Sequence, residues 1–111
     1  MDSGYEVEMT DACTGMFKKL SRREQEAVDK RISEIQKDPS CGDHFSGVEL
    51  KGVLHTHALG RSNDCVVAWS KQEKPKKKII IESVGSHDNI EWLKRVRRNY
   101  GLKSPLVNRL P

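Results

Sequence analysis

Residues 78–88 read Lys-Ile-Ile-Ile-Glu-Ser-Val-Gly-Ser-His-Asp, and this stretch does most to decide the fold. The apolar run before Gly85 is typical of a buried strand, and apolar residues recur at helical spacing from Asn89 onward. The sheet fixes the backbone at such a strand end, while the next side chains can reach solvent. His87 therefore holds a position suited to proton transfer, because imidazole titrates near neutral pH.

Two more histidines occur in the earlier run Val53-Leu54-His55-Thr56-His57-Ala58-Leu59. If this run is a strand, His55 and His57 share one face, because side chains alternate with a period of two. Leu54 and its same-face neighbours suit the side that helices cover. We therefore expect the two histidines on the opposite, open face, although a one-residue slip in register would reverse this.

Length and composition describe one charge-rich domain with a single modest core, since the chain has 111 residues and 35% hydrophobic content. No apolar run approaches the about 20 residues of a membrane span, and the first residues lack a secretion signal. Cys13, Cys41 and Cys65 are odd in number and widely spaced, which argues against a disulfide framework. We expect a cytoplasmic protein without a membrane partner.

Charge is divided unevenly along the chain. Residues 1–50 hold 7 Lys/Arg and 11 Asp/Glu, whereas residues 51–111 hold 13 and 5. The basic half contains two clusters, at 71–78 and 94–98, together with the histidines described above. This combination indicates a polyanionic partner, most simply nucleic acid. Taken alone, each cluster is as compatible with a merely solvated surface as with a binding role. That surface would be a hairpin tip for 71–78 and a helix face for 94–98.

Patterns before residue 50 predict a strand, two helices and a loop. Apolar and acidic residues alternate over Tyr5–Met9, as in a half-buried strand. The polar pair at 10–11 caps a short helix, and the capping box Ser21–Glu24 begins a longer one. The turn-rich residues 39–49 begin with a proline, which ends this helix, and are expected to form a loop.

The second half predicts three antiparallel strands and a final helix, which Asp88 or Asn89 caps and Gly101 ends. The strands are expected at Val53–Leu59, Cys65–Ser70 and Lys78–Val84. The fold class is therefore α+β: an N-terminal strand, a two-helix hairpin, an antiparallel three-strand meander and a C-terminal helix. The hairpin covers one sheet face and the other is open. Residues 1–102 form the single domain, and 103–111 form a tail.

This order of elements, with Leu50-Lys51-Gly52 before one strand and Gly85-Ser86-His87-Asp88 after another, resembles the RelE/ParE superfamily of bacterial toxins. It is most similar to the YafQ-like branch, over residues 5–92. The resemblance implies a RelE-like toxin of a type II toxin-antitoxin system. Such a toxin is an mRNA interferase, an endoribonuclease that cleaves mRNA on the ribosome without a cofactor, and a cognate antitoxin protein holds it inactive.

The resemblance also implies catalytic residues. His57 stands five positions after Gly52 and matches a catalytic histidine of YafQ-like toxins, while His87 matches the histidine of their Gly-Ser-His segment. Asp64 falls near an acidic residue that those enzymes use. RNA cleavage without a metal needs a general base and a general acid, worth about 10²–10⁴-fold. His57 and His87 would share the two proton transfers in an open order, with Asp64 orienting a histidine or acting as a base.

Four further residues are candidates for substrate binding. Arg61 occupies the region of a phosphate-binding arginine in RelE-type members, although the surrounding segment lacks their arginine-rich pattern. Lys51 can likewise stabilise phosphate charge. Trp92, one place beyond the aromatic residue that ends the family motif, either stacks on a base or joins the core. His55 is either a substrate contact or incidental.

Simpler interpretations stand beside each of these roles. In these, His87 only caps the last helix and His57 is an ordinary surface histidine. Trp69 is assigned to the core, and His44 receives no role. A zinc site built on the histidines is not expected, because the chain has neither a Cys pair nor a His-Glu-x-x-His motif.

Two alternative functions remain open. One is a ParE-like toxin without catalysis, which inhibits DNA gyrase and uses the basic helix as a docking surface. The other is a small RNA-binding protein that uses its basic face alone. The low aromatic content of 5% and the lack of a ribonucleoprotein motif count against the latter.

Overall fold

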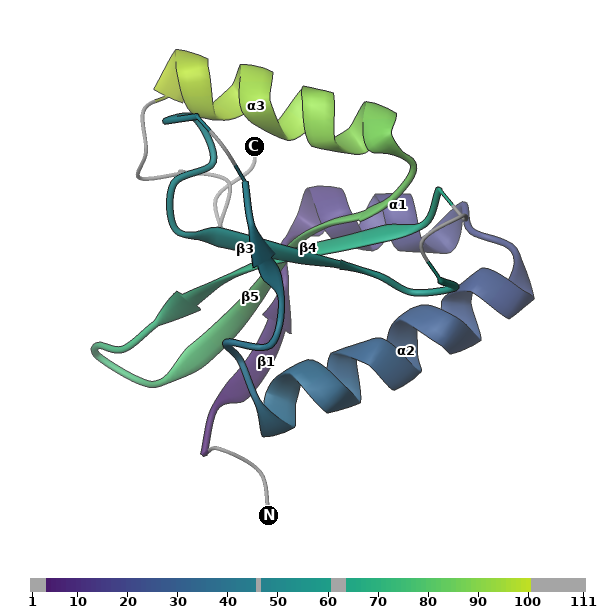
Figure 1. The fold of residues 1–111 in the computed structure, drawn as a ribbon, viewed down its shortest axis with the longest axis horizontal. Helices are drawn as coiled ribbons and strands as arrows, with labels where there is room; N and C mark the ends of the chain where they lie inside the picture. Colours follow the sequence, from purple (N-terminus) through teal and green to yellow (C-terminus); the bar gives the residue numbers. More distant parts are fainter. Residues whose placement is uncertain (1–3, 46, 61–63, 101–111) are drawn as a thin grey trace.

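The computed structural model describes residues 4–45, 47–60 and 64–100, in which the chain forms five strands and three helices (Figure 1). The elements follow in the order β1 (Glu6–Met9), α1 (Asp11–Lys18), α2 (Arg22–Lys37), β2 (Asp43–His44), β3 (Val53–His57), β4 (Val66–Gln72), β5 (Lys78–Gly85) and α3 (His87–Tyr100). The predicted α+β class and the order of its elements are confirmed. Within the described residues, no helix has both the length and the apolar character needed to cross a membrane.

All five strands belong to one sheet, in the order β1-β5-β4-β3-β2. The strands β3, β4 and β5 form the predicted antiparallel meander, in which Val66 of β4 pairs with both His57 and Gly85. The first strand joins the sheet beside the last one, parallel to it, with Glu6 opposite Lys78. The two helices and the strands β2, β3 and β4 lie between these two strands in the chain, and parallel strands need such a long connection.

The two helices of the hairpin begin at the residues that the sequence predicts. The Thr10 hydroxyl accepts a hydrogen bond from the Cys13 backbone N–H at 3.0 Å, which caps α1. Ser21 and Glu24 form both hydrogen bonds of a capping box at the start of α2. The helix ends at Lys37, two residues before Pro39, because a proline disfavours helical backbone at the residue before it.

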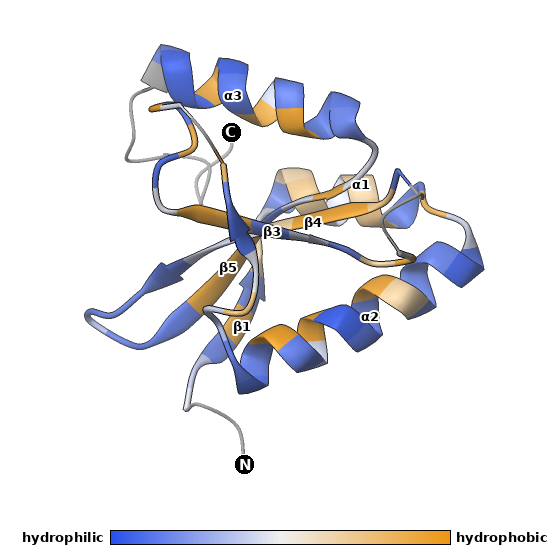
Figure 2. Ribbon diagram, viewed as in Figure 1, coloured by the Kyte–Doolittle hydropathy of each residue, from blue (hydrophilic) through white to orange (hydrophobic). Residues whose placement is uncertain are grey.

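The core has two parts, one on each face of the sheet. The larger part lies under α1 and α2 and contains Trp69, whose indole N–H donates to the Pro39 carbonyl at 2.9 Å. The smaller part joins β3 and β4 to Ile90 and Leu93 of α3. Figure 2 shows the apolar side of each helix turned toward the sheet. The expectation that the second face is open was therefore wrong: α3 covers part of it.

A buried ion pair anchors α3 to the sheet. The register shifts between Ala68 and Trp69, which pair with Ser83 and Ile81, so Glu82 between these partners has no opposite residue. The Glu82 carboxylate is 2% exposed and accepts two hydrogen bonds from the Arg97 guanidinium of α3, at 3.0 and 2.9 Å. A charged side chain of a central strand is thus neutralised by the helix that covers it.

Two local expectations were also wrong. The segment predicted as a loop contains β2, whose Asp43 and His44 pair with His55 and Leu54. A two-residue strand is too short to show a period in sequence. The last helix begins at His87 and not after a cap at Asp88 or Asn89. The expected helix end at Gly101, the boundary at residue 102 and the tail 103–111 lie outside the described residues.

Candidate functional site

Three histidine rings lie together at one end of the sheet, on the face that carries α3. His55 and His57 occupy alternate positions of β3 and share this face as expected, with ring centroids 6.4 Å apart. The ring of His87 lies 6.0 Å from that of His57, centroid to centroid. His55 and His57 are half-buried, whereas the His87 side chain is 64% exposed. The structure therefore brings the two predicted catalytic histidines together.

The sheet register and one glycine place His87 beside β3. Val66 pairs with His57 on one side and Gly85 on the other, which aligns the ends of the three strands. Gly85 has a φ of 111°, a conformation that side chains with a Cβ rarely adopt. The chain turns there directly into α3, and the Asn89 amide closes the turn by donating to the Val84 carbonyl at 2.8 Å.

Asp64 binds His87 twice through one carboxylate oxygen. This oxygen accepts a hydrogen bond from the His87 backbone N–H at 3.1 Å and also contacts Nδ1 of the ring. The hydrogen bond from the His87 side chain, supported by that from its backbone, lowers the pKa of Asp64. With Nδ1 engaged by the carboxylate, Nε2 is the ring nitrogen left for proton exchange. The backbone N–H is one of the donors at the first turn of α3 that have no acceptor within the helix, and Asp64 supplies one.

His55 is held in a less polar environment. Its ring stacks on Phe45 with centroids 4.0 Å apart and an interplanar angle of 20°. Its Nδ1 atom is buried and has no hydrogen-bond partner among the described residues. Burial lowers the pKa of His55, an effect that the backbone of Asp43 partly opposes. Sequence reasoning missed Phe45, because it follows a strand that was predicted as loop.

The remaining predicted residues lie apart from the histidines or outside the described chain. Lys51 is exposed and precedes the first residue of β3, whereas His57 is the last. The strand separates its two ends by about 13 Å at the usual rise of about 3.3 Å per residue. The structure therefore does not bring Lys51 to the histidines. Arg61 lies outside the described residues.

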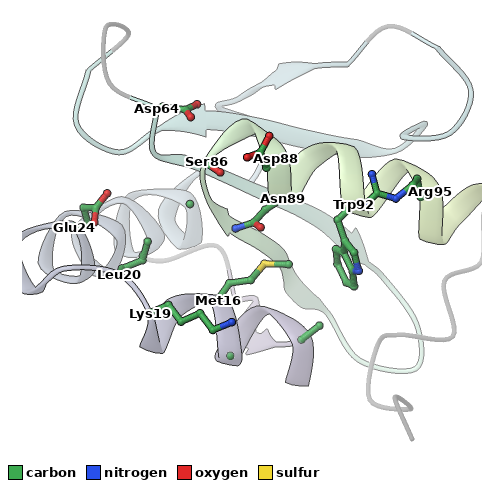
Figure 3. A pocket seen from close by; sticks show the side chains of 13 residues that line it. Met16, Lys19, Leu20, Glu24, Asp64, Ser86, Asp88, Asn89, Trp92 and Arg95 are labelled. Atoms are coloured by element: carbon green, nitrogen blue, oxygen red, sulfur yellow. The ribbon is translucent and has the colours of Figure 1, made fainter.

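Trp92 lines a groove between α1 and α3, with a volume of about 740 Å³ (Figure 3). It follows His87 by five residues, which places it on another side of the helix from the histidine. Trp92 is half-buried and packs against the smaller core, and Met16 of α1 lines the same groove. Asp64, which binds His87, also lines the groove.

Within residues 4–45, 47–60 and 64–100, no group of three or more His, Cys, Asp or Glu side chains is arranged to hold a metal ion. The residues of the cluster offer proton transfer between imidazole rings, one of which is oriented by a carboxylate.

Solved structures of RelE toxins share this fold. A doubly substituted mutant of the E. coli toxin RelE in the free state has a TM-score of 0.68 and 18% identity, covering 88% of this chain and 98% of that chain. The intact E. coli RelBE toxin-antitoxin complex has a TM-score of 0.62 and 17% identity, covering 74% of this chain and 95% of that chain. The archaeal RelE-RelB complex from Pyrococcus horikoshii has a TM-score of 0.51 and 16% identity, covering 75% of this chain and 94% of that chain. At these identities the likeness concerns the fold.

Sequence comparison gives the family. No curated protein matches the chain. The model of one protein family, described as "ParE-like toxin of type II bacterial toxin-antitoxin system", matches residues 7–92, which is most of the chain. The chain therefore belongs to the ParE-like toxins of type II bacterial toxin-antitoxin systems, within the RelE/ParE superfamily.

Proposed function

We propose that this toxin is an endoribonuclease that cleaves mRNA in association with the ribosome, without a metal ion. The observation that carries the proposal is the 6.0 Å separation of the His57 and His87 rings, with Asp64 bound to the latter. Hydrogen bonds of about 2.6–3.2 Å from two such rings can reach oxygens of one phosphodiester group. The YafQ-like character remains part of this proposal.

The two histidines have opposite tasks in the cleavage step. Neutral His57 accepts the proton of the ribose 2′-hydroxyl, whose oxygen then forms a bond to phosphorus. The bond from phosphorus to the 5′-oxygen breaks, and His87 donates its Nε2 proton to that leaving oxygen. The products are a 2′,3′-cyclic phosphate and a 5′-hydroxyl. Asp64 supports the assignment of His87 as the acid, because a carboxylate on Nδ1 suits the ring that carries the extra proton.

The other predicted residues would bind the RNA around the scissile bond. The neutral ring of His55 borders the site and offers a contact to the substrate that adds no charge. Trp92 would stack on a base in the α1–α3 groove, a contact worth about 1–3 kcal/mol. Arg61 and Lys51 would each contact phosphate, the latter before the start of β3.

A cognate antitoxin is the proposed protein partner. The E. coli and Pyrococcus horikoshii RelE toxins were solved together with RelB, which supports a partner of this kind for a toxin with the same fold. Co-purification with the product of a neighbouring short gene tests it. The antitoxin should abolish cleavage when it is bound.

The cleavage proposal is tested by replacing each histidine with alanine. His57→Ala and His87→Ala should each reduce cleavage of RNA by about 10²–10⁴-fold and relieve growth arrest. His44→Ala is the matched control, because this exposed histidine of β2 lies outside the cluster and should leave cleavage unchanged. Full activity of both cluster variants, with folding confirmed by circular dichroism, would refute the proposal.

A substrate with sulfur in place of the bridging 5′-oxygen separates the two roles. A thiolate leaves without a proton, so this substrate should restore cleavage by His87→Ala but not by His57→Ala. Rescue of His57→Ala alone would overturn the assignment of acid and base.

The family description also names ParE, so the non-catalytic alternative needs its own readout. A gyrase poison would accumulate gyrase–DNA breaks on expression and would leave messages intact. RNA binding without toxicity would instead favour a simple RNA-binding protein. Either result would replace the ribonuclease proposal.

A further inference from the structure

The entire excess of positive charge lies on one short hairpin. Residues 71–78, which join β4 to β5, hold five lysines and one glutamate. This segment alone has a net charge of +4, equal to that of the whole chain, and the other 103 residues carry 15 basic and 15 acidic side chains. The sequence has a second basic cluster at 94–98, and the two clusters differ in how far carboxylates neutralise them.

Carboxylates neutralise most of the second cluster. Lys94 pairs with Glu91 at 3.2 Å within α3, and Arg97 forms the buried pair with Glu82. Arg98 lies 3.5 Å from Glu49. Arg95 lines the α1–α3 groove. The helix is therefore basic in sequence, but three of the four cations in this cluster are paired with carboxylates.

The lysines of the hairpin are largely free of such partners. Lys74 and Lys76 are exposed and form no ion pair with any described residue. Lys71 donates to the Ser40 hydroxyl at 3.1 Å, and Lys77 lies 5.6 Å above the Tyr5 ring, neither of which removes charge. Only Lys78 is paired, with Glu8 at 3.2 Å.

The glutamate within the hairpin is engaged elsewhere. Glu73 accepts a hydrogen bond from the Tyr5 hydroxyl of the neighbouring chain segment. This hydrogen bond engages the Tyr5 hydroxyl, and the Tyr5 ring packs against the larger core. The exposed tip thus offers ammonium groups on flexible stems, without an aromatic platform on which a base could stack.

The tip is distant from the histidine cluster. The cluster lies at the end of the sheet where Val66 pairs with Gly85, whereas the hairpin begins where Gln72 pairs with Lys78. Six steps along β4 correspond to about 20 Å at about 3.3 Å per residue. Figure 1 shows the hairpin extending from the sheet on the side away from the turn into α3. A ligand of the tip is therefore not the phosphodiester in the cluster.

We propose that this lysine hairpin is a docking surface for the phosphate backbone of double-helical RNA, separate from the catalytic cluster. Lysines without a stacking platform recognise charge and not base sequence, and a double helix offers closely spaced phosphates on two strands. The inference rests on the proposed ribonuclease function, since it gives the toxin a hold on structured RNA about 20 Å from the bond it cleaves.

The test compares two variants with the same change in charge. The hairpin variant carries Lys74→Gln, Lys76→Gln and Lys77→Gln. The control carries Lys18→Gln, Lys30→Gln and Lys37→Gln, which are exposed positions on α1 and α2. Binding of the full chain to a fluorescent RNA duplex is measured by anisotropy over about 50–200 mM salt, the range in which phosphate contacts are strongly salt-dependent.

The hairpin variant should bind the duplex at least about tenfold more weakly than the wild type, and its log–log salt slope should be smaller by about 2–3. The control should keep the wild-type slope. An unchanged slope in the hairpin variant, or an equal loss in the control, would overturn the inference. Retained duplex binding with lost capture of an acidic antitoxin would also overturn it, in favour of a protein partner.

Cleavage of a short single-stranded RNA separates this inference from the proposed function. The hairpin variant should cleave it at the wild-type rate, whereas His57→Ala should lose cleavage and keep duplex binding. Duplex binding that depends on the hairpin, in a wild-type protein that cleaves no RNA either free or on added ribosomes, would refute the ribonuclease and leave the docking surface standing. Cleavage without duplex binding would refute only the docking surface.

Discussion

One carboxylate oxygen of Asp64 binds both the backbone N–H and the ring of His87, a residue 23 positions later in the chain. The contact ties the segment before β4 to the start of α3. It engages Nδ1 and orients the imidazole, so the proposed proton transfer would run through Nε2. The contact also has a measurable consequence for the titration of Asp64.

Replacing His87 with alanine should raise the pKa of Asp64 toward its ordinary value of 3.8, because the side-chain hydrogen bond that lowers it is lost. In the wild type this contact contributes stability at pH values above the ordinary pKa of Asp64. The contribution is lost as the pH falls through the lowered pKa. Carboxyl chemical shifts followed by NMR measure the midpoint. His44→Ala should leave it unchanged, and equal midpoints in wild type and His87→Ala would contradict the prediction.

The stacked pair Phe45 and His55 gives a second titration. Burial lowers the pKa of His55 below 6.5, so Phe45→Ala should raise it by exposing the ring to water. Phe45→Leu keeps an apolar cover and should preserve most of the shift. Because the unfolded chain takes up this proton first, stability should fall as pH drops from about 6.5 toward the lowered pKa. NMR titration of the His55 ring protons measures the midpoints in the wild type, Phe45→Ala and Phe45→Leu. Equal midpoints in all three would exclude this account.

The ion pair between Glu82 and Arg97 should matter far more for stability than its exposed neighbour. Arg97→Ala leaves a carboxylate that is 2% exposed without its charge partner, which should lower the free energy of unfolding by about 3–5 kcal/mol. Arg98→Ala is the matched control, because its pair with Glu49 joins side chains that are 63% and 32% exposed and is worth about 0–1 kcal/mol. Urea denaturation measures both. Similar losses in the two variants would show that burial of the pair is not what matters.

Two glycines should respond to alanine with opposite signs. A Cβ at Gly42 would lie 2.7 Å from the His55 carbonyl oxygen and 2.9 Å from an indole carbon of Trp69. Gly42→Ala should therefore lower the free energy of unfolding by about 1–3 kcal/mol and disturb the pairing of β2 with β3. At Gly15, within α1, a Cβ meets nothing within 4 Å, so Gly15→Ala should stabilise by about 0.5–1 kcal/mol. Thermal unfolding distinguishes the two, and effects of the same sign would contradict the packing argument.

Local signals predicted most of the fold. The alternation over Tyr5–Met9, the capping box at Ser21 and the apolar run before Gly85 each depend on residues close together in sequence, and each element formed where expected. The shared face of His55 and His57 followed from the two-residue period of a strand. The strand β2 was missed because two residues show no period, and its pairing with β3 is what stabilises it.

The site was predicted only in part, because its parts come from distant segments. His57 and His87 were named from short patterns, but their separation depends on the register that aligns β3, β4 and β5. Phe45 gave no signal in the sequence. Trp92 and Lys51 were grouped with the histidines by their places in a motif, whereas the structure sets them on another side of α3 and at the other end of β3.

The sequence by itself determined the order of the main elements, the caps of α1 and α2 and the shared face of His55 and His57, because backbone preference and side-chain periodicity act over a few residues. Tertiary structure alone decided which sheet face α3 covers and which of the two basic clusters keeps its charge. Both depend on partners far away along the chain, such as Glu82 for Arg97. A charge pattern in sequence cannot reveal whether a distant carboxylate neutralises it.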